Sequence, residues 1–184
     1  AAFAYGGGKG QVESVRKVTG LPIEGYVVTG FGGFRSIVNE SGGLPMTVAK
    51  KVVLQGETTV KAGKQILTGK FALAYARERK SLPDGDFGRS AHQTEMLLAA
   101  AVTARVQGVT IVPKEMSIVS KHAETDLSAA EALTFVASFY KINPTKIGHT
   151  TAKGGFGTSP DGQSIVVLDA ASKKAFANFR DGRL

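Results

Sequence analysis

Cysteine and tryptophan are both missing from this chain of 184 residues. The lack of cysteine excludes disulfide bonds, thiolate catalysis and metal sites with cysteine ligands, although it does not identify a cellular compartment. Long apolar runs are missing too: the longest covers residues 96–102, whereas a membrane-spanning helix needs about 20 apolar residues. No cleavable signal sequence is recognisable.

Motifs for nucleotides, metals and nucleic acids are also lacking. The glycine-rich segment 6–10 does not have the spacing of a phosphate-binding loop, so we interpret it as a flexible turn. His92, His122 and His149 are scattered without metal-ligand spacing. No DNA or RNA motif appears and the few tyrosines are not interleaved with the basic residues, so a nucleic-acid partner is not expected.

The composition fits one globular domain with a positive charge. Hydrophobic residues make up 42% of the chain and charged residues 21%. The 23 basic residues outnumber the 15 acidic ones, which gives a net charge of +8. This balance indicates an anionic partner: nucleic acid, an anionic lipid headgroup or an acidic polymer. Charge alone does not choose among them.

The most informative segment, residues 75–93, sets three arginines and Lys80 around a short acidic turn. Arginine donates through a rigid fork that matches phosphate oxygens, so Arg77, Arg79 and Arg89 together suit a diphosphate. Arg77 and Arg79 share a face only in an extended chain, which we therefore expect over residues 77–79. The run 87–106 predicts a helix that places Arg89 in its positive first turn and Gln93 on the same face.

A plainer interpretation of this segment is a solvated charge run with surface ion pairs, such as Arg77 with Glu78 or Asp86. Asp86 lies between the arginines in sequence, which suggests two roles. It orients Arg77 or Arg89, or it acts directly near an acceptor hydroxyl. Residue order favours the phosphate-binding interpretation, and the orienting role for Asp86.

Helical and strand patterns alternate along the chain. Helices are predicted at residues 11–19, 34–38, 68–76 and 87–106, after a capping box at Ser128 and Glu131, and after Asp169, and a short helix or a turn is predicted at residues 114–120. Strands are predicted at residues 23–29, 45–49, 51–55, 58–61, 109–112, 145–150 and 164–168, with a glycine-rich loop at 154–162. This alternation predicts a single layered α/β domain with a mixed central sheet and helices on both faces.

Several motifs in order resemble the LytR-CpsA-Psr family, bacterial enzymes that attach polyprenyl-linked glycopolymers to peptidoglycan. The similar segments are residues 1–7 with Tyr-Gly-Gly, 21–28, 31–43 with two phenylalanines and Gly-Gly, and 67–79 with Ala-Leu-Ala-Tyr-Ala-Arg-Glu-Arg; Gly85 to Arg89 with Gln93 complete the pattern. The resemblance covers roughly residues 1–106 and fits the remainder more loosely.

The resemblance implies an α-β-α fold with a hydrophobic lipid tunnel. Six apolar residues are candidates for its lining: Phe31, Phe34, Ile37, Leu73, Leu97 and Leu98. Family members usually carry a membrane helix, two strands and acidic metal ligands before the Tyr-Gly-Gly segment. We therefore expect this chain to be a fragment of one catalytic domain, residues 1–184, whose metal ligands lie upstream of Ala1.

The resemblance implies a phosphotransferase that moves a glycan phosphate from a polyprenyl diphosphate carrier to peptidoglycan and releases polyprenyl phosphate. A pyrophosphatase side activity is compatible with this enzyme. The site implied is Arg77, Arg79, Arg89 and Asp86 for catalysis, with Gln93 and Lys80 binding substrate, and Mg²⁺ or Mn²⁺ as cofactor. The partners are the lipid-linked glycan, its membrane lipid tail and the acceptor, at the extracytoplasmic face of the membrane. The alternative is a non-catalytic binder of anionic wall polymer or nucleic acid.

Overall fold

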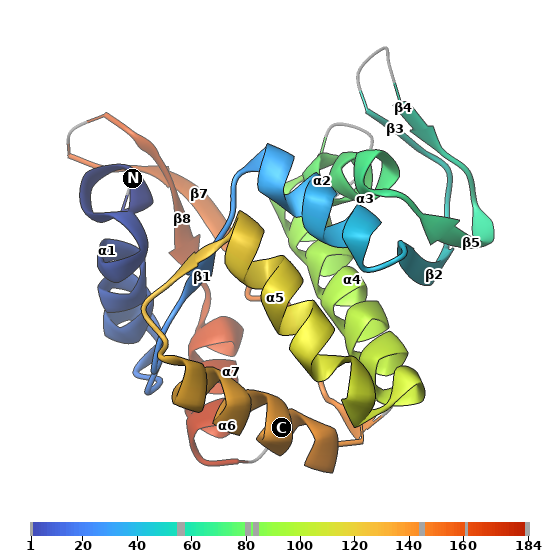
Figure 1. The fold of residues 1–184 in the computed structure, drawn as a ribbon. Helices are drawn as coiled ribbons and strands as arrows, with labels where there is room; N and C mark the ends of the chain where they lie inside the picture. The colour runs from blue at the N-terminus through green and yellow to red at the C-terminus, as the bar shows by residue number, and fades with distance from the viewer. Residues whose placement is uncertain are drawn as a thin grey trace. The chain divides into compact units, whose positions relative to one another are not determined.

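The computed structural model describes residues 2–54, 58–79, 82, 85–143, 146–160 and 162–182. The chain divides into two compact units, one formed by residues 1–26 and 148–184 and the other by residues 27–147. Both combine helices with short antiparallel strand pairs (Figure 1). The chain is therefore a mixed α/β protein, as the alternating patterns predict.

The first unit consists of helix α1 (Ala2–Thr19), the paired strands β7 (Gly154–Thr158) and β8 (Ser164–Leu168), and helix α7 (Ala170–Arg180). Helix α1 begins earlier than predicted and is broken at Gly7, where φ is 57°. Asp169 caps α7 as predicted, because its side chain accepts a hydrogen bond of 2.6 Å from the Ser172 amide.

The predicted loop at residues 154–162 is wrong, because β7 occupies most of it. The predicted strand at residues 145–150 is also wrong over its described part, residues 146–150. Glycine permits the close pairing of β7 with β8: a Cβ added to Gly154 would lie 2.1 Å from the Val167 carbonyl oxygen. The glycines thus mark a close backbone approach rather than a loop.

The second unit contains most of the helices. They are α2 (Phe31–Glu40), α3 (Gly69–Arg77), α4 (Asp86–Gln107), the 3₁₀ turn η1 (Val109–Ile111), α5 (Val112–His122) and α6 (Ala129–Lys141). The predictions of α2, α3, α4 and α5 are confirmed. The predicted strand at residues 109–112 is wrong, because Pro113 stands in the first turn of α5, where it favours a helix start.

The strands of the second unit form nested antiparallel pairs. Strand β2 (Leu44–Val48) pairs with β5 (Gly63–Leu67), and β3 (Val52–Leu54) pairs with β4 (Thr58–Val60). We call residues 44–67 the ribbon. Far apart in sequence, β1 (Val27–Val28) pairs with β6 (Glu124–Thr125). The strands predicted at residues 45–49, 51–55 and 58–61 are confirmed over most of their described parts, β5 was not predicted, and only two residues of the predicted strand 23–29 form one.

The predicted mixed central sheet is not found in the described part of the chain. Its strands form four separate two-stranded sheets, and all four pairs are antiparallel. Alternating hydrophobicity marks a strand but does not identify its partner, which depends on the connections. The connections from β3 to β4 and from β7 to β8 are too short for a parallel crossover, which needs a dozen or more residues, whereas β1 and β6 are brought together from distant parts of the chain.

The core of the second unit lies between the ribbon and helices α3 and α4. Val48, Val60 and Leu67 turn one face of the ribbon inward and are at most 1% exposed. Ala72 and Tyr75 of α3 pack in the same cluster, as does Met96 of α4. Alternate ribbon residues are therefore held against α3 while the other face stays in solvent.

Acidification is expected to weaken the start of α6. The Ser128 hydroxyl and amide donate to the Glu131 carboxylate at 2.6 and 2.8 Å, and these bonds lower the pKa of Glu131. The ionised Glu131 carboxylate therefore stabilises the helix start fully at a pH above the pKa that Glu131 has in the unfolded chain. This stabilisation is lost as the pH falls through the pKa that Glu131 has in the folded protein. The protection factor of the Glu131 amide, its exchange rate corrected for the intrinsic dependence of exchange on pH, should fall over that range. Glu131→Gln keeps an acceptor but should abolish the pH dependence of this turn; an unchanged profile would contradict the assignment.

Candidate functional site

An open pocket of about 470 Å³ lies where α3 ends and α4 begins. Its volume is within the usual range of small-ligand sites, about 300–1,000 Å³. Four of the residues predicted from sequence line it together: Arg77, Arg79, Arg89 and Gln93. The convergence of the three arginines, expected only from their order in sequence, is thus a feature of the fold. We call this cavity the arginine pocket.

A change of backbone conformation brings the first two arginines to this pocket. Arg77 is the last residue of α3, and the chain becomes extended at Glu78, where φ is −62° and ψ is 134°. The prediction of an extended segment over residues 77–79 is therefore correct only from Glu78 onward. Arg89 lies in the first turn of α4, as predicted, where the helix dipole favours anions.

Asp86 bridges two of the arginines. Its Oδ1 atom lies 3.3 Å from Nη1 of Arg79 and 3.4 Å from Nη1 of Arg89. The side chains of Arg79 and Arg89 remain 54% and 38% exposed, so each pair contributes little to stability, at most about 1 kcal/mol. What the pairs supply is orientation: one carboxylate holds two guanidinium groups near each other while leaving donors open to a ligand.

Arg77 is positioned by an aromatic ring instead of a carboxylate. Its guanidinium carbon lies 4.4 Å from the centre of the Phe31 ring, which also lines the pocket. Such a cation–π contact holds the planar group against a flat surface and leaves its edge free for hydrogen bonds. Phe31 was predicted as a candidate for the tunnel lining, and no sequence motif around it indicated the contact with Arg77.

Helix α4 binds the exposed carbonyl groups at the end of α3. The Gln93 side-chain amide donates to the Ala76 carbonyl at 3.1 Å, and His92 Nδ1 lies 3.3 Å from the Tyr75 carbonyl oxygen. The His92 ring also stacks on Tyr75, with centroids 4.0 Å apart. Gln93 therefore helps to fix the turn that precedes Arg77. Sequence reasoning missed the role of His92, whose spacing resembles no known motif.

Tyr75 anchors the same junction from inside. It is 1% exposed, and its hydroxyl donates a hydrogen bond of 2.5 Å to Glu95 on α4. Burial raises the pKa of the Tyr75 phenol, and the hydrogen bond to Glu95 and its negative charge raise it further. The phenol thus remains a protonated donor that ties α3 to α4 beneath the arginine pocket.

Glu78 is an acidic pocket residue that the sequence did not single out for function. It is 2% exposed, and its Oε1 accepts a hydrogen bond of 2.7 Å from the Arg79 amide. This hydrogen bond joins the Glu78 side chain to the next backbone amide, and it supports the extended conformation of Glu78 between the two arginines. Lys80, the remaining predicted substrate-binding residue, lies outside the described residues.

The described residues do not provide a complete set of ligands for a divalent metal ion. Nowhere in the ranges given above do three His, Asp or Glu side chains come close enough to hold one. Asp86 is shared between two arginines and Glu78 is buried, so the pocket carboxylates of the described chain do not form a cation site by themselves.

A second cavity, of about 250 Å³, is lined almost entirely by apolar residues of α4, α5 and α6, among them Ala101, Met116 and Phe139. None of the six predicted tunnel residues lines it. Within the described residues no single helix is long and apolar enough to span a membrane; residues 86–107 and 109–122 reach that length and composition only as a pair bent by 104°.

Comparisons with known proteins agree with the sequence motifs. The family model described as the LytR_cpsA_psr family matches residues 1–180. The teichoic acid transferase TagV of Bacillus subtilis is 31% identical over 84% of this chain. TagT of the same species, also named a polyisoprenyl-teichoic acid–peptidoglycan teichoic acid transferase, is 30% identical over 79%.

Solved structures show the same fold. The crystal structure of B. subtilis TagV superposes with a TM-score of 0.80 and 28% identity, covering the whole of this chain and 73% of that one. The chain spans 41% of the full length of TagV and 48% of that of TagT. Because the family model matches nearly all of its residues, this chain belongs to the LytR-CpsA-Psr family.

Proposed function

We propose that this protein transfers a glycopolymer from a polyprenyl diphosphate carrier to peptidoglycan. The observation that carries the proposal is the convergence of Arg77, Arg79 and Arg89 in one pocket. Three guanidinium groups match the charge and the geometry of a diphosphate. The names of the relatives, which are teichoic acid transferases acting on peptidoglycan, support the same reaction class.

In the proposed reaction, an acceptor sugar hydroxyl attacks the glycan-bearing phosphorus. A new phosphorus–oxygen bond forms, the bond to the bridging oxygen breaks, the hydroxyl proton is released, and polyprenyl phosphate leaves. Phosphoryl transfer of this kind depends mainly on positioning and charge neutralisation. Arg77 and Arg79 bind the two phosphates, and Arg89 stabilises charge on the transferring or leaving group.

The supporting residues keep these three groups aligned. Asp86 orients Arg79 and Arg89 through its shared oxygen, and Gln93 holds the turn before Arg77. These contacts favour the orienting role of Asp86 over direct action on the acceptor hydroxyl. Mg²⁺ or Mn²⁺ dependence, a pyrophosphatase side activity and Lys80 as a substrate ligand are further parts of the proposal, and no step above is assigned to the metal.

The lipid tail and the location form the rest of the proposal. The apolar cavity between α4, α5 and α6 supports binding of an apolar chain, but its volume of about 250 Å³ suits a short segment rather than a whole polyprenyl tail. Because peptidoglycan is the acceptor, the reaction takes place at the extracytoplasmic face of the bacterial membrane.

Release of polyprenyl phosphate tests the proposal directly. The protein is incubated with lipid-linked glycan and peptidoglycan, with Mg²⁺ or Mn²⁺ and separately with a chelator, and lipid products are quantified. Release together with glycan attached to peptidoglycan is the expected result. Binding of lipid-linked glycan without release in the presence of either metal would overturn the proposal and would indicate a polymer-binding protein instead.

A further inference from the structure

Four lysines lie at or beside the bend of the ribbon. The β2–β5 pairing ends at Val48 and Gly63, and the β3–β4 pairing begins at Val52 and Val60. Between them the strands are not paired over residues 49–51 on one side and 61–62 on the other. These two segments and the second residue of β5 carry the residues that we call the lysine bend: Lys50, Lys51, Lys61 and Lys64.

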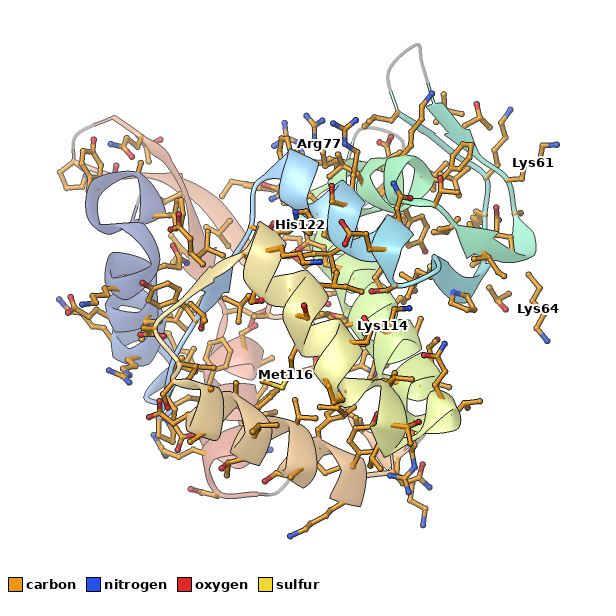
Figure 2. The ribbon with its side chains drawn as sticks, in the orientation of Figure 1. Lys61, Lys64, Arg77, Lys114, Met116 and His122 are labelled. Atoms are coloured by element: carbon orange, nitrogen blue, oxygen red, sulfur yellow. The ribbon has the colours of Figure 1, made fainter. Side chains whose placement is uncertain are left out.

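The lysine bend has an unbalanced charge. All four side chains are exposed, and within the described residues none lies within ion-pair distance of a carboxylate. In the sequence of the ribbon, residues 44–67, the four lysines face a single acidic residue, Glu57, which lies outside the described residues. Figure 2 shows Lys61 and Lys64 extending from the outer edge of the ribbon, away from the helices. Neighbouring like charges repel, and an anionic partner relieves that repulsion.

Protection of a sheet edge is the ordinary explanation for lysines on a ribbon. That role places charges along the unpaired edge of a strand. Here three of the four lysines, Lys50, Lys51 and Lys61, lie in the unpaired bend rather than within a strand. Their position is therefore better explained by a ligand that crosses the bend.

The ribbon connects the lysine bend to the arginine pocket. Leu54, the last residue of β3, lines that pocket. Lys51 precedes Leu54 by three residues, a distance of roughly 10 Å along a strand at about 3.3 Å per residue. The buried side chains of Val52 and Val60 hold this part of the ribbon in the core cluster that includes α3. A linear molecule that leaves the pocket along the ribbon therefore meets the lysines within a few monomers.

We propose that the lysine bend binds the phosphate-bearing polymer that extends from the diphosphate in the arginine pocket. This inference rests on the proposed function and adds a second binding surface, outside the arginine pocket, for a linear polymer with regularly repeated negative charge. Lysine is suited to this task because its ammonium group is a flexible point charge, which follows a mobile polyanion without demanding one geometry. The arginines select the diphosphate; the lysines retain the chain attached to it.

Binding of a lipid-free polymer tests the lysine bend separately from turnover. The probe is fluorescently labelled poly(glycerol phosphate), and dextran of similar length is the neutral control polymer. One variant replaces Lys50, Lys51, Lys61 and Lys64 by glutamine. The matched control replaces four exposed lysines elsewhere in the same unit, Lys114, Lys121, Lys141 and Lys146, and therefore has the same net charge.

The bend variant is expected to bind poly(glycerol phosphate) at least about tenfold more weakly, while the control variant stays close to the parent protein. If four phosphates are neutralised, the affinity of the parent protein should fall roughly fiftyfold between 50 and 200 mM salt, and the bend variant should lose most of this dependence. Equal losses in both variants, or no loss in either, would overturn the proposal.

Turnover of a lipid diphosphate that carries a single neutral sugar separates this inference from the proposed function. The bend variant should process that short substrate at the parent rate, since the arginine pocket is intact. A fall in this rate equal to the loss of polymer binding would show that the lysines act on the pocket itself and would overturn the inference. Absence of turnover in the parent, with polymer binding retained, would overturn the proposed function alone.

Discussion

Replacing Arg89 by alanine is expected to lower the turnover of lipid-linked glycan by a factor of about 10² to 10³, the usual cost of removing one donor that stabilises transition-state charge. Arg89 lies in the first turn of α4 and lines the arginine pocket beside Arg79. Its side chain is 38% exposed, so its removal leaves the core untouched. Polyprenyl phosphate release in steady state measures the effect.

The matched control for this substitution is Arg35→Ala. Arg35 is an exposed arginine of α2 that does not line the pocket, so the change in charge is the same and only the position differs. The control should retain nearly full activity. An Arg89→Ala protein that folds normally and works at the parent rate would remove Arg89 from the mechanism.

Alanine at Gly33 is expected to make the protein less stable than alanine at its neighbour Gly32 by about 1–3 kcal/mol, the usual cost of overpacking. A Cβ at Gly33 would lie 2.3 Å from the His122 carbonyl oxygen and 2.5 Å from Oγ1 of Thr29. A Cβ at Gly32 meets nothing within 4 Å. Both substitutions gain the same helix propensity, about 1 kcal/mol, so the difference between them isolates the steric clash.

Urea unfolding midpoints of the two variants measure this difference. Gly32→Ala should be as stable as the parent or more stable, and Gly33→Ala should unfold at a lower concentration. The close approach matters for the site because α2 carries Phe31, the ring that faces Arg77. Equal midpoints would show that α2 and the end of α5 are not packed as closely as described.

Much of the local structure could be predicted from particular residues. Apolar spacing predicted α4 to within a residue at each end, and Ser128 with Glu131 predicted the start of α6. Gly42 and Gly43 marked the end of α2 and have φ values of 90° and 89°. The strand expected at residues 109–112 failed because β-branched residues also tolerate helices when a proline starts one.

The candidate site was predictable only as a set of residues. The order of Arg77, Arg79, Arg89 and Gln93 indicated phosphate binding and resembled one family, which the family model confirms. Their roles remain predictions. No local sequence pattern predicted that Phe31 would contact Arg77, or that His92 would stack on Tyr75, 17 residues earlier in the chain.

The sequence by itself determined most of the helices, several of the strands and which residue types are available for a diphosphate. Hydrogen bonds within a helix and the caps at its ends depend on neighbours a few positions apart, so local patterns are sufficient for them. The tertiary structure decided the strand partners, the pocket at the junction of α3 and α4, and the sharing of Asp86 between two arginines. Those features depend on how buried surfaces such as Tyr75 and Met96 pack together, and packing joins residues whose separation along the chain carries no signal.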